Sequence, residues 1–164
     1  MKLRPMTRAD VPAFATAFRE IVDAGETYAY PEDLPDNAIA DLWMEGAPGR
    51  AVVAIDDDGS FLGAAKMGPN RPGRGAHIGT ASFMVSSAAR GKGVGRALAR
   101  DMIDWHRRQG YAGIQFNAVV ETNMAAVRLW QDLGFRILGT VPGAFRSATH
   151  GPVGLHVMFL DLSS

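Results

Sequence analysis

A glycine-rich, cationic segment precedes a stretch with the spacing of an amphipathic helix. Residues 90–95 read RGKGVG, and apolar side chains then recur at helical intervals up to Trp105. A helix N-terminus presents unpaired N–H groups and the positive end of the helix dipole, so it attracts anions. Glycines let the backbone curve around a phosphate without interference from Cβ atoms. We therefore expect a pyrophosphate to contact Arg90, Gly91, Lys92, Gly93, Val94, Gly95 and Arg96.

Two common phosphate-binding motifs do not fit this segment. A dinucleotide fingerprint requires G-x-G-x-x-G or a final alanine, but the sixth position is Arg96 when counted from Gly91 and Leu98 when counted from Gly93. A Walker A loop requires Ser or Thr after Gly-Lys, whereas Gly93 follows Lys92. A different pattern does fit, Arg/Gln-x-x-Gly-x-Gly/Ala, which Arg90, Gly93 and Gly95 satisfy after a predicted strand ending at Val85.

A second motif lies further along the chain. Residues 121–135 read ETNMAAVRLWQDLGF, which is similar to Asn-x-x-Ala-x-x-Leu-Tyr-x-x-x-Gly-Phe. Together with the glycine-rich segment, this motif resembles the GNAT superfamily of acyl-CoA-dependent N-acetyltransferases. The resemblance covers nearly the whole chain, because the predicted order of elements also agrees.

The resemblance implies roles for the strand before the glycine turn and for the second motif. Phe83, Met84 and Val85 are expected to line the pantetheine arm of acetyl-CoA, and a backbone N–H near Met84 to polarise the thioester carbonyl. Asn123 is expected to contact pantetheine and is equally well placed as a helix N-cap. Many family members carry a tyrosine acid where this chain has Trp130, whose indole is not a useful acid. Trp130 is expected either to pack against the acetyl end of the cofactor or to be a core aromatic.

The resemblance implies direct attack by a neutral amine on acetyl-CoA, with both substrates bound together. An alkylammonium has a pKa of about 10.4, so a base or a water chain must assist its deprotonation. Glu26 is a candidate base in the loop between the first two helices, which borders the acceptor site in this fold. Tyr28 and Tyr30 in the same loop are candidate substrate contacts. Asn117, a polar residue in an otherwise apolar strand expected to be buried, and Glu121 are the candidate substrate contacts near the thioester.

The composition limits the other classes of function. Seventeen Lys and Arg balance seventeen Asp and Glu, so no overall field favours nucleic acid or a membrane surface. The chain has no cysteine, which excludes disulfides, thiolate metal sites and a cysteine acyl-enzyme. Asp56, Asp57 and Asp58 fit a hairpin turn better than a metal site. We expect no metal and no membrane span, and the lack of a signal-peptide pattern favours a cytoplasmic protein.

Periodicity places these residues on one domain, residues 1–164, with the order β-α-α-β-β-β-α-β-α-β-β. Asp10 and Asp36 are the expected caps of the first two helices, and residues 142–152 (PGAFRSATHGP) are an expected loop. The fold class is α/β (α+β), a GNAT-like mixed, mostly antiparallel sheet of six to seven strands with helices on both faces.

The most specific hypothesis is an N-acetyltransferase that acetylates a primary amine of a small molecule, such as an amino acid. The alternatives are a non-catalytic acyl-CoA-binding module on the same fold, and an acetyltransferase of protein lysines or N-termini. The resemblance also makes a homodimer an option, because the last strands of such sheets often pair between subunits.

Overall fold

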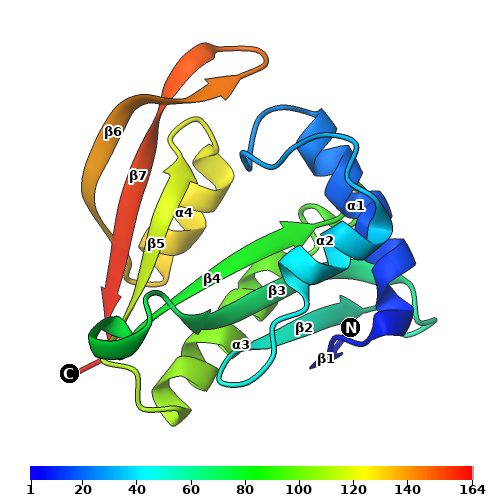
Figure 1. Cartoon of the computed structure of the whole chain (residues 1–164), viewed down its shortest axis with the longest axis horizontal. Helices are drawn as coiled ribbons and strands as arrows, with labels where there is room; N and C mark the ends of the chain where they lie inside the picture. The colour runs from blue at the N-terminus through cyan, green and yellow to red at the C-terminus, as the bar shows by residue number, and fades with distance from the viewer. Residues whose placement is uncertain (164) are drawn as a thin grey trace.

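The computed structural model of the chain describes residues 1–163 and contains one seven-stranded mixed sheet (Figure 1). The strand order is β1-β2-β3-β4-β5-β7-β6, and all neighbouring strands are antiparallel except β4 and β5. The strands are β1 (Lys2–Pro5), β2 (Arg50–Ile55), β3 (Phe61–Pro69), β4 (Ile78–Val85), β5 (Gly113–Val120), β6 (Arg136–Ser147) and β7 (Gly151–Asp161). The predicted fold class and element order are confirmed.

Helices cover both faces of the sheet. They are α1 (Val11–Asp23), α2 (Asp36–Trp43), α3 (Val94–Arg108) and α4 (Met124–Asp132). One hydrophobic core joins α1 and α2 to one face of β2, β3 and β4, and another joins α3 and α4 to the opposite face. Strand β2 is therefore buried on both sides, which explains its nearly continuous apolar sequence RAVVAI.

The sheet opens between its two parallel strands. Strands β4 and β5 pair only at Ile78 with Gly113 and at Gly79 with Ile114, and beyond these residues they diverge (Figure 1). The C-terminal half of β4 therefore has an open edge, and β5, β7 and β6 form a second wing of the sheet. Backbone N–H and C=O groups on an unpaired edge are available to another extended chain or ligand arm.

The last two strands are longer than the sequence suggested. We expected a loop over residues 142–152, but β6 continues to Ser147 and only residues 148–150 form the turn to β7. The pairing register shifts between Val141 and Phe145, so a bulge accommodates Pro142 and Gly143 within the hairpin. The breaker residues therefore bend β6 without ending it.

The two predicted helix caps have different outcomes. Asp10 is the N-cap residue of α1, as expected, but its carboxylate makes no capping hydrogen bond to α1 and instead accepts from the Thr7 backbone N–H at 2.8 Å and pairs with Arg4. Asp36 is the first residue of α2, whose N-cap is Pro35, and its carboxylate pairs with Arg19 at 2.5 Å. Both aspartates therefore support the helix starts through arginine partners.

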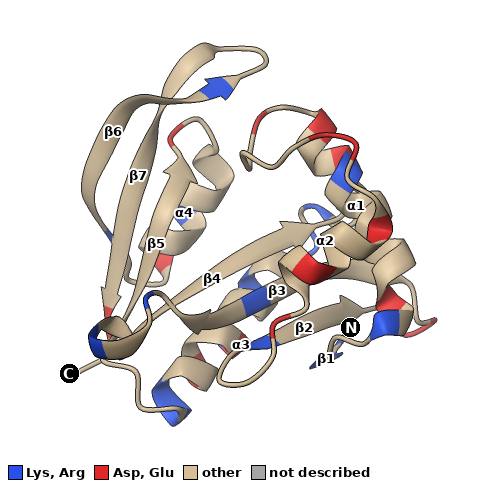
Figure 2. Cartoon of the chain, viewed as in Figure 1, with Lys and Arg blue, Asp and Glu red and all other residues tan. Residues whose placement is uncertain are grey.

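Charged residues are spread over helices and loops (Figure 2). Within residues 1–163 no helix has both the length and the apolar character needed to cross a bilayer. The described residues also contain no group of three or more His, Cys, Asp or Glu side chains arranged to hold a metal ion. Asp56, Asp57 and Asp58 form the turn between β2 and β3, as predicted.

Candidate active site

The glycine turn lies at the N-terminus of α3, as the sequence predicts. Gly91 and Gly93 adopt the left-handed region, with φ of 76° and 77°, and an added Cβ at either position would meet no atom within 4 Å. Within the described residues, no acceptor is recorded for the backbone N–H groups of residues 93–96. The turn therefore offers a row of free donors in open space at the positive end of a 15-residue helix.

The flanking cations of this turn differ in their surroundings. Arg90 and Lys92 are exposed, and their side chains have no ion-pair partner within residues 1–163. Arg96 pairs with Asp132 of α4 at 2.7 Å, and both side chains are exposed. Among the described residues, the Arg90 and Lys92 side chains are thus free to bind an anion, whereas Arg96 already links α3 to α4.

The open edge of β4 ends beside this turn. In a β-strand, successive residues direct their backbone N–H and C=O groups to opposite edges. The Ser86 N–H donates to Leu62 O of β3 at 3.0 Å, so Met84 also faces β3, whereas Phe83 and Val85 face the opening. The N–H groups that face the opening near Met84 are therefore those of Phe83 and Val85, and Met84 itself is buried against α1 and α2.

The hydroxyl of Tyr28 occupies part of this edge. It accepts from the Phe83 N–H at 2.9 Å and donates to the Phe83 carbonyl at 2.5 Å. The Tyr28 ring stacks on Tyr30, with centroids 5.6 Å apart, and burial raises the pKa of both phenols. The loop after α1 therefore reaches the open edge of β4 in the middle of the sheet.

Trp130 lies beneath the same part of β4. Its ring centroid is 4.8 Å from that of Phe83 and 4.7 Å from that of Phe116, and only 6% of the residue is exposed. Of the two roles expected for Trp130, these contacts favour the core aromatic. The Asn123 side chain caps α4 by accepting from the Ala126 N–H at 3.3 Å, as expected.

Glu26 binds the β6–β7 turn. Its carboxylate accepts from Ser147 Oγ at 2.6 Å and from the Thr149 N–H at 3.0 Å, and His150 Nδ1 lies 3.8 Å away. The hydrogen bond from Ser147, followed by those from Thr149, lowers the pKa of Glu26 below its ordinary value. The Ala148 N–H also donates to Gly25 O at 2.9 Å. The loop after α1 and the hairpin turn are thus joined across the opening.

Asn117 belongs to a cluster of amides at the opening. The expectation that this side chain is buried is wrong, because the residue is exposed just where β5 bulges away from β7. Its Nδ2 donates to Asn70 Oδ1 at 2.6 Å and its Oδ1 accepts from Gln115 at 2.8 Å. The Glu121 carboxylate instead accepts from the Gly154 N–H at 2.5 Å, so it supports β7.

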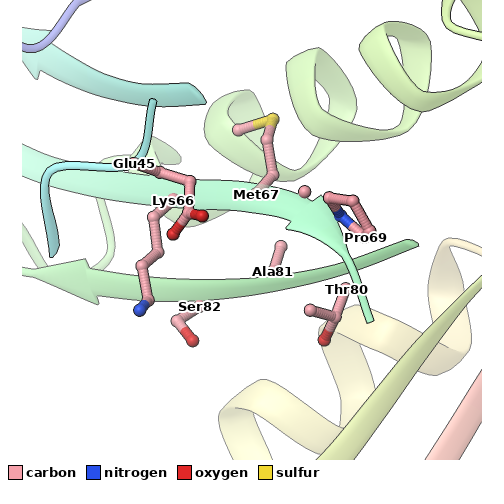
Figure 3. Close-up of a pocket in the computed structure, with 8 residues that line it drawn as sticks. Glu45, Lys66, Met67, Pro69, Thr80, Ala81 and Ser82 are labelled. Atoms are coloured by element: carbon pink, nitrogen blue, oxygen red, sulfur yellow. The ribbon is translucent and has the colours of Figure 1, made fainter. Parts of the chain in front are cut away.

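A pocket of about 220 Å³ lies next to these amides, between the end of α2 and strands β3 and β4. Lys66, Ser82 and Thr80 extend from β3 and β4 to the same side of the sheet (Figure 3). The Lys66 ammonium donates to Leu42 O at the end of α2 at 2.6 Å. Pro69, which directly precedes Asn70, closes the other end of the pocket.

Several of these polar residues were not predicted from the sequence. Lys66 interrupts an apolar strand, and this signal could have identified it. Asn70, Ser147 and Thr149 had no comparable signal, since each meets its partner only through the fold.

The chain is similar to proteins of known sequence and known structure. Residues 15–135 match the family described as the acetyltransferase (GNAT) family. A GCN5-related N-acetyltransferase from Kribbella flavida has a solved structure that matches with a TM-score of 0.95 and 60% identity, over 98% of this chain and 97% of that chain. A phosphinothricin acetyltransferase from Sinorhizobium meliloti, solved in complex with AcCoA, shares the fold with a TM-score of 0.88 at 21% identity, over 98% and 87% of the two chains.

Two relatives found by sequence are also named as acetyltransferases. N-acetyltransferase aca1 of Schizosaccharomyces pombe is 40% identical over 143 residues, which cover 79% of this chain and 68% of the relative. The L-methionine sulfoximine/L-methionine sulfone acetyltransferase of Pseudomonas paraeruginosa is 33% identical over 140 residues, covering 82% and 79%. These relatives support an acyltransferase enzyme over a non-catalytic binding module. With the glycine turn, the open β4 edge and the α4 motif in one fold, the chain belongs to the GNAT family of acetyltransferases.

Proposed function

We propose that this enzyme transfers the acetyl group of acetyl-CoA to a primary amine of a small molecule, by direct attack in a ternary complex. The observation that carries the proposal is the continuity between the open β4 edge and the α3 N-terminus. An added Cβ at Gly95 would lie 3.9 Å from Val85, so the end of the strand adjoins the start of the helix. One extended ligand can therefore pair along β4 and leave its pyrophosphate on the free N–H groups of α3.

The other cofactor contacts follow from this path. Arg90 and Lys92 supply mobile charge to the phosphates, and the Val85 N–H is a donor for the pantetheine arm. The amide Nδ2 of Asn123 has no recorded partner within residues 1–163 and is available to the same arm. Trp130 acts indirectly, because its ring supports Phe83 from below.

The reacting amine must lose a proton before it attacks. A carboxylate whose pKa is lowered is a weaker base, so hydrogen bonds from Ser147 and Thr149 make Glu26 poorly suited to this task. We assign Glu26 to joining the two loops that border the acceptor and to attracting a cationic amine. Deprotonation then proceeds through water, and the absence of cysteine in the chain agrees with direct transfer.

The acceptor side favours a small polar amine. Hydroxyls from Thr80 and Ser82 and the Lys66 ammonium line a pocket whose volume suits a molecule of amino-acid size. Asn70 directly follows Pro69 at one end of this pocket, and its amide is bonded to that of Asn117. The relative from Pseudomonas paraeruginosa is named for acetylating L-methionine sulfoximine and L-methionine sulfone, which supports an amino-acid type of acceptor. A protein lysine remains the second candidate acceptor, because the opening between the wings is accessible from outside.

Thiol release from acetyl-CoA, followed across a panel of amino acids, simple amines and basic peptides, tests the proposal. We expect release above the spontaneous rate with at least one small amine, and none with an N-acetylated version of the same compound. Release only with peptides would support the protein-lysine alternative. Acetyl-CoA binding without release from any amine would contradict the proposed reaction.

A further inference from the structure

Phe83 lies on the open edge of β4, beyond Gly79 where the pairing with β5 ends, and a side chain takes the place of a strand neighbour there. Its N–H and its carbonyl both face the opening, and the Tyr28 hydroxyl bonds to the two groups at 2.9 and 2.5 Å. One hydroxyl therefore acts on β4 as the N–H and C=O of an adjacent strand would. Any ligand that pairs with β4 at Phe83 must take this position from Tyr28.

The surroundings of Tyr28 direct its hydroxyl to the open edge of β4. Tyr28 has a φ of 63°, an unfavourable conformation for a residue with a side chain. Stacking on Tyr30 and an edge contact with Trp43, with centroids 6.3 Å apart, hold the ring. The bonds of Gly25 and Glu26 to the β6–β7 turn hold the backbone just before it. The loop thus delivers a hydroxyl to the open edge at the expense of local strain.

The family resemblance already implies that a β4 backbone N–H polarises the thioester carbonyl, and we propose that the Tyr28 hydroxyl is a second donor, which completes an oxyanion hole with the Phe83 N–H. This inference rests on the proposed function, since it needs the thioester to lie on the open edge of β4. The thioester oxygen accepts from the Phe83 N–H, and the displaced hydroxyl, moved by about one hydrogen-bond length (~2.7 Å), donates to the same oxygen. Two donors then converge on the atom that gains charge in the transition state.

Tyr28 does not have to give up its proton during acyl transfer. The amine nitrogen forms a bond to the carbonyl carbon, and the carbonyl π electrons move to the oxygen held by Tyr28 and Phe83. When the carbonyl forms again, the C–S bond breaks and its electron pair leaves with sulfur. The proton of the amine passes to water, and the phenol keeps its own proton.

The Tyr28 hydroxyl is too weak an acid to protonate the leaving thiolate, so its role differs from that of a general acid. An ordinary phenol has a pKa of about 10 and an ordinary thiol about 8.5, so proton transfer from tyrosine to the leaving thiolate is already unfavourable. Burial raises the pKa of Tyr28 further. The hydroxyl therefore stays protonated at neutral pH and acts as a hydrogen-bond donor, which is the property an oxyanion hole requires.

The test is Tyr28→Phe, with Tyr111→Phe at the far end of the sheet as the matched control. For Tyr28→Phe we expect kcat to fall about 100-fold, as for loss of one oxyanion donor. The Kd for acetyl-CoA should stay equal or become lower, because the thioester no longer displaces the hydroxyl. Simple damage to the site would weaken binding as well as turnover. The shape of the pH–rate profile should be unchanged, since no titrating group is removed.

An unchanged kcat in Tyr28→Phe, or a tenfold weaker affinity for acetyl-CoA, would overturn this inference while leaving the proposed function intact. Failure of the wild-type enzyme to release thiol would instead remove the proposed function itself. If Tyr28→Phe does not fold, 3-fluorotyrosine at position 28 keeps the shape and strengthens the donor. A kcat at or above that of the wild type then supports the oxyanion hole, and a tenfold fall at pH 7 overturns it.

Discussion

At the scale of single residues, the acceptor side is a set of polar groups that find partners far away in the sequence. Asn117 bonds to Asn70, 47 residues earlier, and Glu26 bonds to Ser147, 121 residues later. The sequence identified Asn117 and Glu26 because of their types and positions. Their partners could not be predicted, because these contacts depend on how two loops and two wings of the sheet come together.

Asn117→Ala tests the acceptor side. We expect the KM for the amine to rise about tenfold, since roughly 1.4 kcal/mol corresponds to loss of one good hydrogen bond to the substrate. The KM for acetyl-CoA should change less than twofold. Steady-state kinetics with each substrate varied in turn measures both values.

Asn37→Ala provides the control, because Asn37 is exposed on α2 and has no recorded side-chain partner in the described part of the chain. Equal effects of the two substitutions, or a change confined to the KM for acetyl-CoA, would refute the role of Asn117.

At the scale of elements, the local signals were reliable where one short segment decides the structure. The glycines at 91 and 93 need a left-handed backbone, so the turn before α3 could be predicted from residue types alone. The length of β6 could not, because Pro142 and Gly143 usually end a strand and here a bulge accommodates them. The bulge depends on pairing with β7, which the local sequence does not encode.

Gly93 and Gly110 allow a matched test of the turn. They flank α3, have φ of 77° and 79°, and an added Cβ at either would meet no atom within 4 Å. We expect Gly93→Ala and Gly110→Ala to lower the free energy of unfolding equally, by about 1 kcal/mol, because both force alanine into the left-handed region. Urea denaturation measures this loss.

Only Gly93→Ala should also weaken acetyl-CoA binding, since its methyl group would enter the space assigned to the pyrophosphate. If Gly93→Ala lowered the free energy of unfolding more than Gly110→Ala does, the glycine at position 93 would be needed for folding. Its presence would then not indicate a ligand site.

At the scale of the whole molecule, the packing of α3 against the sheet encloses a titratable side chain. His106 of α3 is fully buried, and its Nδ1 lies 2.9 Å from Met102 O. Within the described residues, its Nε2 has no hydrogen-bond partner and lies close to Gly79. Burial lowers the pKa of His106 below its ordinary value, so the folded protein binds this proton more weakly than the unfolded chain does.

This predicts a pH dependence of stability. Above about pH 6.5 the histidine is neutral in both states and has no effect. Between that value and the lower pKa of the folded protein, the unfolded chain binds more protons at this histidine, so stability falls as pH falls, by up to ~1.4 kcal/mol per pH unit. Urea denaturation between pH 7 and pH 5 should show this slope in the wild type. In His106→Leu the slope should be reduced, and identical slopes would contradict the assignment.

In the proposed complex, the α3 N-terminus holds the pyrophosphate of acetyl-CoA. Isothermal titration of acetyl-CoA into the wild type, Gly93→Asp and Gly110→Asp measures this contact. We expect micromolar affinity for the wild type and Gly110→Asp, and at least about tenfold weaker binding for Gly93→Asp, whose carboxylate opposes the anion at a cost above ~1.4 kcal/mol. Equal affinity of all three proteins for acetyl-CoA would contradict it.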